Sequence, residues 1–318
     1  MTANTIVCDD ALTALQRLPD ESVHLAITSP PYWNTVDYGV AGQLGQSRYE
    51  QYIADLLAVW RETARVLVPN GKLCINTPIM PVPKRVDRSA HTRQLKNINT
   101  DIEASILYGW EHGDRPAPPC DLLRYSLFIW QKQTSEKMFG SYPYPPNLYE
   151  DNTIEFINVF VKPGRPRKLS KAVKEASRLT QRQWVNLTMQ VWPIYPADVA
   201  RIQGHPAPFP LVLPQRLIAM YSFQAVPDEG FDGDIVLDMF NGTGSTCLAA
   251  RAMRRRYIGI ELNPAFCDVA RERLRTALTE ADLDSLLLER VRMSKKRPPA
   301  KAPDSASRPQ RSRHGEED

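Results

Sequence analysis

Apolar residues recur along this chain with two spacings, and each spacing predicts a different kind of element. Short, nearly continuous apolar runs predict buried strands, at Thr5–Val7, Val23–Thr28, Lys72–Asn76, Asp234–Asp238 and Tyr257–Glu261. Apolar positions three and four residues apart predict helices, at Ala11–Leu18, Ser47–Val66, Leu213–Tyr221, Ser245–Arg254 and Pro264–Leu278. Strands alternate with helices at both ends of the chain, which favours an α/β fold with a parallel sheet.

The longest of these helices carries its own start and stop signals. Ser47 and Glu50 have the spacing of a capping box, and Pro69-Asn70-Gly71 follows as a helix terminator. Between these limits, six apolar residues recur at helical spacing, namely Tyr49, Tyr52, Ile53, Leu56, Leu57 and Trp60. We interpret this face as core.

The middle of the chain, from Pro78 to about Pro210, follows neither spacing for long. Prolines, aromatic residues and basic residues mix there, with two β-like runs at Ser126–Trp130 and Phe156–Val161. Beyond about Leu288 the chain is rich in Lys, Arg, Pro and Ser, a composition typical of disorder. We find no internal repeat.

Composition excludes several classes of protein. No stretch approaches the roughly 20 apolar residues that span a bilayer, and Met1–Asn4 has no charged and apolar leader. The five cysteines are scattered and never spaced Cys-x-x-Cys, which favours a reducing compartment and argues against a disulfide framework or a cysteine zinc site. The five histidines form no ligand pattern, so we expect no metal. The cysteine usage and the absence of a leader together favour a cytoplasmic protein.

The net charge of +4 becomes informative once it is located. Residues 291–318 alone carry +4, so the rest of the chain is neutral overall. Two local runs stand out, +7 over Lys162–Arg182 and +4 over Lys84–Lys96. Such runs could contact phosphates, but for a charge run taken alone we favour the simpler interpretation of a solvated face or mobile loops.

The segment Val236–Gly244 has the form of a cofactor loop. An apolar strand ends in Asp238, a turn bearing Gly242 and Gly244 follows, and then a helix begins. Glu261 ends the next strand, where a carboxylate would bind ribose hydroxyls in a nucleotide-binding fold. Cys247 replaces the third glycine of the dinucleotide fingerprint. This favours a nucleoside cofactor with a small zwitterionic tail over a pyrophosphate, although Gly-x-Gly alone also suits an ordinary tight turn.

The second chemical motif is Ser29-Pro30-Pro31-Tyr32, at the end of the strand Val23–Thr28. An exocyclic amine on a base is a poor nucleophile because its lone pair is delocalised into the ring. Hydrogen-bond acceptors placed on its hydrogens, here the Ser29 hydroxyl and the Pro30 carbonyl, can redirect that lone pair. The prolines stiffen the backbone, Tyr32 offers a face for stacking an extruded base, and Trp33 could extend that wall. A rigid exit from a strand is the simpler alternative.

Taken together, these motifs resemble the β class, the permuted class, of amino-methylating DNA methyltransferases. The resemblance spans residues 5 to 280 and rests on several segments: Thr28–Tyr32, Asp238–Thr246, Tyr257–Glu261, His205–Pro210 with Leu217-Ile218, Cys8–Leu12 with its Asp10, Gly140–Pro146 and Phe156–Pro163.

The resemblance implies a doubly wound, Rossmann-like methyltransferase sheet that is circularly permuted and carries an inserted target-recognition region. The strand bearing Asp10, which would otherwise follow those bearing Asp238 and Glu261, here opens the chain. We therefore expect a catalytic half at 1–77, an insert with the target-recognition region at 78–202, a cofactor-binding half at 203–288 and a basic disordered tail at 289–318.

The resemblance also implies S-adenosylmethionine as cofactor and direct methyl transfer to nitrogen. Asp10 would bind its adenine, Glu261 its ribose, and Phe209 would pack nearby. The other implied cofactor-binding residues are Thr28, Asp238, Phe240, Gly242, Gly244, Ser245 and Thr246. The implied catalytic residues are Ser29, Pro30, Pro31 and Tyr32.

The implied partner is double-stranded DNA, with Trp33, Lys168, Lys171 and Lys174 as candidate contacts. A homodimer, a companion restriction enzyme and a prokaryotic, nucleoid-associated setting also follow from the resemblance. Serine at position 29 is commoner in the family with cytosine N4 targets, so we expect cytosine N4, with adenine N6 as the alternative.

Three rival hypotheses stay open at this stage. A cytosine-C5 methyltransferase needs a cysteine nucleophile, for which Cys120 is the candidate. A methyltransferase of RNA or of a protein amide would usually carry Asn in place of Ser29 and lack the long basic insert. A DNA-binding protein that keeps the fold without catalysis would not need an intact Ser29, Asp238 and Glu261.

Overall fold

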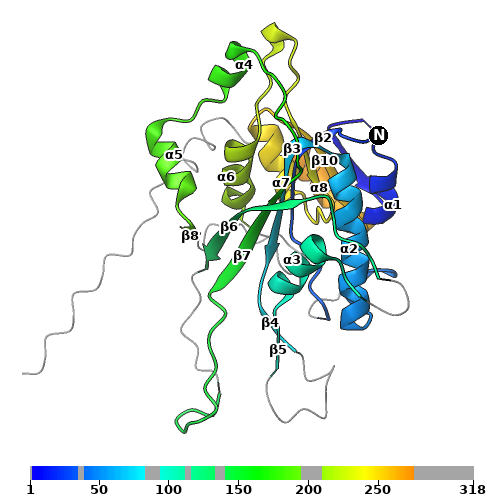
Figure 1. Cartoon of the computed structure of the whole chain (residues 1–318), viewed down its shortest axis with the longest axis vertical. Coiled ribbons are helices and arrows are strands. Elements are labelled where there is room, and N and C mark those ends of the chain that lie inside the picture. The colour runs from blue at the N-terminus through cyan, green and yellow to red at the C-terminus, as the bar shows by residue number, and fades with distance from the viewer. Residues whose placement is uncertain are drawn as a thin grey trace, which may run out of the picture.

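The computed structural model of the chain describes residues 2–34, 39–82, 94–111, 116–132, 140–194 and 210–275. An eight-stranded sheet runs through its centre, with helices on both faces (Figure 1). The strands are β1 (Thr5–Cys8), β2 (Val23–Thr28), β3 (Leu67–Thr77), β4 (Met80–Pro81), β5 (Leu95–Lys96), β6 (Leu123–Gln131), β7 (Ile154–Val161), β8 (Val191–Pro193), β9 (Ile235–Asp238) and β10 (Arg256–Glu261). The helices are α1 (Ala11–Gln16), α2 (Tyr49–Val66), α3 (Ile98–Tyr108), α4 (Lys171–Ala176), α5 (Gln181–Thr188), α6 (Val212–Tyr221), α7 (Ser245–Ala252) and α8 (Pro264–Arg275).

The sheet has the order β1-β10-β9-β2-β3-β7-β6-β8, while β4 and β5 pair separately. From β1 to β3 all neighbours are parallel, whereas β7 is antiparallel to both β3 and β6. We call the edge at which β1, β2, β3, β9 and β10 end the carboxyl edge, and the opposite one the amino edge. Strand order reverses between β2 and β9, which is where open α/β sheets bind ligands.

Alternate residues of the central strands feed two separate cores, and this makes the fold doubly wound. In β2, Ala26 faces a core built with α1, α2 and α3. Its neighbours Leu25 and Ile27 face the opposite core, to which α6 and α7 contribute. Both faces of the parallel strands are therefore covered, which explains why they appear in the sequence as continuous apolar runs.

The permutation that the resemblance implies is confirmed by strand pairing. Thr5–Cys8 pairs in parallel with residues 258–261, so Cys8 lies opposite Glu261. The strand that opens the described chain thus completes the sheet beside the strand nearest its other end. Asp9 and Asp10 follow directly after β1, and they reach the same edge as Asp238 and Glu261.

One local expectation is corrected by the structure. No capping box forms at α2, because the helix begins at Tyr49 with Arg48 as its N-cap and without a side-chain cap bond; the Ser47 hydroxyl instead donates to the Arg48 carbonyl at 3.4 Å. Within the predicted insert, 78–202, the strands β6, β7 and β8 pair in the central sheet.

Among the described residues, no helix is both long and apolar enough to cross a membrane.

Candidate active site

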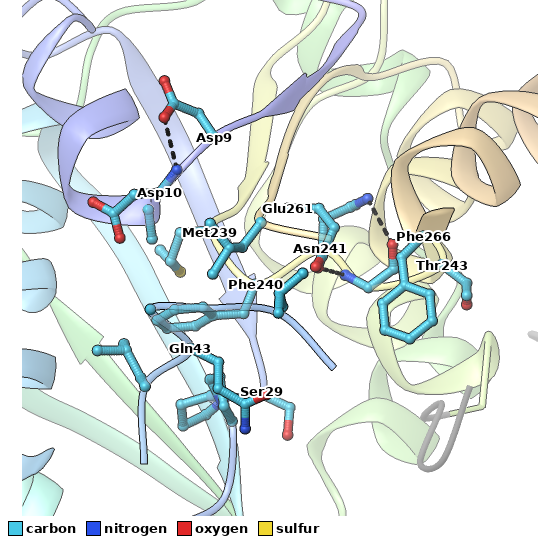
Figure 2. A pocket seen from close by; sticks show the side chains of 18 of the residues that line it. Asp9, Asp10, Ser29, Gln43, Met239, Phe240, Asn241, Thr243, Glu261 and Phe266 are labelled. Carbon is cyan, nitrogen blue, oxygen red and sulfur yellow. Dashed lines mark hydrogen bonds between the residues drawn. The ribbon is translucent and has the colours of Figure 1, made fainter. Parts of the chain in front are cut away.

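A pocket opens at the carboxyl edge, where β1, β2, β9 and β10 end. It encloses about 930 Å³, counting its open mouth, within the range of roughly 300–1,000 Å³ that ligand pockets occupy. Nine of the predicted site residues line it: Asp10, Ser29, Pro30, Pro31, Tyr32, Phe240, Gly242, Ser245 and Glu261. Figure 2 shows Asp9 and Asp10 on one side, Glu261 and Phe266 on the other, and Phe240 between them with Ser29 close by. The two sequence motifs, about 210 residues apart, meet here.

The Ser29–Tyr32 segment is held rigidly against its neighbours. The Ser29 hydroxyl lies 2.9 Å from the Tyr32 hydroxyl and 3.2 Å from the carbonyl oxygen of Asn76, at the end of β3. The Tyr52 hydroxyl, from the buried face of α2, donates to the Pro31 carbonyl at 2.9 Å. Fixed prolines and a tethered carbonyl keep this segment ordered before any ligand arrives, which reduces the entropy lost on binding.

Asp238 organises the floor of the pocket from beneath. It is 1% exposed and accepts hydrogen bonds from the hydroxyls of Thr28 and Thr246, each at 2.7 Å, and from the Phe240 amide at 3.1 Å. Burial raises the pKa of Asp238 to about 6, although these hydrogen bonds oppose the shift. Thr28, Asp238 and Thr246 are thus brought together but do not line the pocket. Their bonds join β2 to the loop after β9.

Glu261 fixes the shape of the cofactor loop while facing the pocket. Its carboxylate accepts from the Gly242 amide at 2.8 Å (Figure 2). It also accepts from the Asn263 amide at 2.8 Å. Burial raises its pKa, against these backbone bonds. Gly244 lies behind the pocket at the start of α7, with φ of +86°, and a Cβ there would lie 2.9 Å from the Ala270 side chain. Only glycine suits this position.

Asp10 has a structural partner as well as a place in the pocket. It is the N-cap of α1 and accepts from the Thr13 amide at 2.9 Å. Asp9, which sequence reasoning did not single out, lines the same side and accepts from the Asp10 amide at 2.8 Å. Among the described residues that line the pocket, Asp9, Asp10 and Glu261 are the charged ones, and all are acidic. This lining suits a ligand that carries positive charge and disfavours a pyrophosphate.

Several lining residues carried no sequence signal strong enough to be predicted. Gln43 and Leu44 come from the segment after Tyr32, Asn241 and Thr243 from the cofactor loop, and Phe266 from α8. Phe266 could have been found, because it lies in the first turn of the helix that follows Glu261. Phe240, by contrast, was predicted. Its ring meets the buried Trp60 edge-on, with centroids 6.0 Å apart, so α2 supports the wall of the pocket.

Trp33 does not extend the stacking wall as predicted. It is 7% exposed, its indole donates to the Ser47 carbonyl at 2.9 Å, and its ring packs edge-on against Tyr49 with centroids 5.0 Å apart. An indole has a large apolar surface, and here that surface completes the core beside α2. Trp33 therefore supports the loop from inside and is not available for DNA.

The predicted lysines lie at the amino edge, far from the pocket. Lys168, Lys171 and Lys174 are exposed on and before α4, which lies at the top of Figure 1, away from β4 and β5 at the carboxyl edge. Their segment is anchored there, because Arg167 pairs with Asp234, the residue before β9. The physical reason is that antiparallel β7 returns the chain to the amino edge before the basic run begins. No pattern in the sequence indicates this reversal.

Of three further predictions, two fall mainly outside the described residues and one is placed away from the pocket. Phe209 lies outside the described residues, as do most of the basic residues of the Lys84–Lys96 run. Cys120 lies beside Arg61 and Lys162 in a small cavity apart from the pocket, and burial raises its pKa to about 12. A thiol that is protonated and remote from the cofactor loop cannot serve as a cytosine-C5 nucleophile.

Comparison with known proteins gives this site its class. The sequence profile of the DNA methylase family, which groups N6- and N4-methyltransferases, matches residues 23–272. The chain belongs to this family. It is a DNA amino-methyltransferase that depends on S-adenosylmethionine, and the family contains enzymes of both amino positions.

Individual relatives agree with the family match. The Type II methyltransferase M.MjaI of Methanocaldococcus jannaschii is 30% identical over 86% of this chain and 91% of its own length. M.XycI of Xanthomonas campestris pv. cyanopsidis is 28% identical over 86% of this chain and 88% of its own.

Solved structures agree as well. The structure of the putative DNA modification methylase TTHA0409 of Thermus thermophilus, complexed with S-adenosyl-L-methionine, has a TM-score of 0.64 and 32% identity, covering 85% of this chain and 92% of that one. PvuII DNA methyltransferase shares the fold at 18% identity, with a TM-score of 0.58 over 90% and 92% of the two chains.

Proposed function

We propose that this DNA methylase transfers a methyl group to the N4 amine of a cytosine flipped into the pocket at the carboxyl edge. The observation that carries the proposal is that Ser29–Tyr32 and the Asp238–Gly244 loop meet at one pocket. A methyl donor held by the loop would face an amine held by Ser29. Transfer then depends on holding donor and acceptor in line, with no covalent intermediate on the protein.

The chemistry of the lining supports a cofactor role for its acidic half. S-adenosylmethionine carries a positive sulfonium and an amino group, which the three carboxylates would favour. We assign Glu261 to the ribose hydroxyls and Asp10 to the adenine, since each retains acceptor capacity beyond its bonds to the protein. Phe240 and Phe266 offer aromatic surface to the adenine and the sulfonium. Thr28, Asp238, Gly244 and Thr246 act one layer away, by shaping the loop.

The catalytic role falls to the Ser29 end of the pocket. The Ser29 hydroxyl and the Pro30 carbonyl would accept the two hydrogens of the amine, and the face of Tyr32 that lines the pocket would stack on the base. A cytosine and an adenine both present such an amine, so adenine N6 is the alternative outcome. Serine in place of a carboxylate is the feature that favours cytosine.

The experiment is direct. The purified protein is incubated with S-adenosylmethionine and unmodified genomic DNA, and the digested nucleosides are analysed by mass spectrometry. We expect N4-methylcytosine. If N6-methyladenine is the only methylated nucleoside, the target base is adenine and not cytosine, and the protein is still an amino-methyltransferase. Base-resolved sequencing of the same DNA would give the recognition site.

For target recognition we propose residues 140–153, the described part of the connection between β6 and β7, which project from the carboxyl edge at the bottom of Figure 1. Tyr142 and Tyr144 are 73% and 74% exposed there. The Asn152 side chain, nearer β7, donates to the Ile79 carbonyl at 3.3 Å, just beyond the end of β3. Duplex DNA that delivers a base to Ser29 must approach this edge, so the two tyrosines are placed to meet it.

A homodimer, a companion restriction enzyme and association with the nucleoid remain predictions from the resemblance. Size-exclusion chromatography with light scattering would test the first, and a monomer at all concentrations would exclude it.

A further inference from the structure

A buried carboxylate that no sequence motif indicated lies directly behind the Ser29–Tyr32 segment. Glu155, the second residue of β7, is 7% exposed. One of its oxygens accepts from the Asn76 side-chain amide at 2.5 Å and lies 3.4 Å from the Tyr32 hydroxyl. Its other oxygen lies 2.7 Å from the ammonium of Lys132, which follows β6. Three strands therefore place one negative charge next to the residues that would hold the base.

This carboxylate sets the direction of a short chain of hydrogen bonds. A carboxylate paired with Lys132 only accepts, so the Tyr32 hydroxyl donates its proton to Glu155. The Tyr32 oxygen can then accept from the Ser29 hydroxyl, 2.9 Å away. The other neighbour of that hydroxyl, the Asn76 carbonyl at 3.2 Å, is also an acceptor. In either arrangement the proton of Ser29 points into the protein, and its lone pairs are left for the incoming amine.

A second observation shows that the amide of Asn76 is also ordered by Glu155. Its nitrogen must face the carboxylate, since an amide oxygen there would meet another acceptor. This leaves the Asn76 side-chain oxygen buried without a hydrogen-bond partner among the described residues. Such orphan acceptors are costly in a folded protein and commonly mark a place where a ligand completes the bonding.

We propose that Glu155 is the positioning residue that turns Ser29 into an acceptor and receives the proton released by methylation. The inference rests on the proposed role of Ser29. In the reaction, the bond from sulfur to the methyl carbon breaks, the carbon bonds to the amino nitrogen, and the sulfonium becomes a neutral thioether. The nitrogen, now positively charged, passes one proton to Ser29. Ser29 passes its own to Tyr32, and Tyr32 passes its own to Glu155.

Lys132 completes this arrangement by keeping a positive charge beside Glu155 before transfer. Its side chain is 19% exposed, and its ammonium also lies over the Trp130 ring, 5.7 Å from the centroid. Among the described residues, the charged and titratable groups that face Glu155 are thus Tyr32 and Lys132. The Glu155 side chain is itself 9% exposed, so solvent can take the accepted proton from its carboxyl group directly; the Lys132 ammonium, which has no lone pair, does not carry it.

The test compares Glu155→Gln, Tyr32→Phe and the double variant with the parent. Methyl transfer is followed in a single turnover on unmodified genomic DNA, with protein in excess over sites and a labelled methyl donor. Each single variant should slow transfer by about 100-fold, the usual size of a proton-transfer contribution. The double variant should be no slower than the singles, because both act on one chain of hydrogen bonds. Binding of S-adenosylmethionine, measured by calorimetry, should change by less than about threefold.

A matched control separates this role from simple support of the fold. Asp234 is another buried, ion-paired carboxylate, 3% exposed in its side chain, but it lies at the amino edge. Asp234→Asn should lower the melting temperature without slowing single-turnover transfer. The inference is overturned if Glu155→Gln transfers methyl groups within about threefold of the parent rate, or if the losses of the two single variants multiply. If Ser29→Ala also leaves transfer intact, the proposed function itself fails.

Discussion

The carboxyl edge and the amino edge of the central sheet carry different kinds of charged residues. At the carboxyl edge, the charged residues that line the pocket are few and acidic, and two separate sequence motifs line the same pocket. At the amino edge the charges are many and basic, and buried ones are paired within the protein, as Asp234 is with Arg167. A dense basic run is the easier signal to find in a sequence, yet here it lies away from the chemistry. Charge density alone does not locate a nucleic-acid site.

The largest effect should follow from removing the acceptor at the carboxyl edge. Ser29→Ala leaves the prolines and Tyr32 in place but removes the hydroxyl, so single-turnover methyl transfer should fall by about 100- to 1,000-fold. S-adenosylmethionine should still bind, because the cofactor residues lie across the pocket. Rate and binding are measured on the same preparation. A rate within about tenfold of the parent would remove Ser29 from the mechanism.

At the amino edge, the next effect should appear in stability. His24, at the start of β2, has a side chain that is 15% exposed and accepts from the Ile235 amide at 3.1 Å. Burial lowers its pKa to about 4 from the ordinary 6.5, against the opposing influence of Asp234. The folded state therefore resists protonation, and its stability should be retained above pH 6.5 and lost as the pH falls toward 4. Between about pH 8 and pH 5 the loss is about 2 kcal/mol.

Urea unfolding of the parent and of His24→Gln at both pH values measures this contribution. The comparison with the variant is needed because burial raises the pKa of Asp238 to about 6, and a raised carboxyl pKa adds stability as the pH falls. The variant lacks the His24 contribution. From pH 8 to pH 5, the free energy of unfolding should therefore fall by about 2 kcal/mol more in the parent than in the variant. Parallel pH profiles for the two proteins would contradict the assignment.

The smallest effects concern DNA affinity, and here the two edges can be compared directly. Tyr142→Ala with Tyr144→Ala, at the carboxyl edge, should raise the KM for DNA by about tenfold, since one lost base contact costs on the order of 1–3 kcal/mol. Lys168→Gln, Lys171→Gln and Lys174→Gln together, at the amino edge, should change it by less than about threefold. KM values at two salt concentrations test both. A large, salt-dependent loss in the lysine variant, with none in the tyrosine variant, would reverse our view of where DNA lies.

Much of the parallel sheet could be predicted from the sequence, because its strands are buried on both faces. Val23–Thr28 agrees with β2 in both bounds, and the cofactor loop lies where the run ending in Asp238 placed it. The permuted order was predicted as well, but from the resemblance to the β class and not from the spacing of residues. The strands and the loop, by contrast, depend on local patterns.

The remainder depended on contacts between distant segments. The burial of Trp33 is decided by Tyr49 and Ser47, which pack around it, and an aromatic residue beside Tyr32 gives no sign of this. Glu155 lies just before the apolar run Phe156–Val161, which predicts a strand and nothing more. It gains its place only when β7 pairs with β3 and brings it to Asn76. For Glu155 and for the basic segment around Lys168, the missing information was that β7 pairs antiparallel with β3.

The pairing of β1 with β10 also bears on how this protein is made. Asn4 and Tyr257, which are bonded to each other, lie 253 residues apart. At about 5–20 residues per second, a ribosome needs roughly 10–50 s between the two. During that time the first strand has emerged but its partner does not exist, and the carboxylates of Asp10 and Glu261 cannot face one pocket. A nascent chain is therefore expected to be unable to bind its methyl donor until β10 and Glu261 have been made.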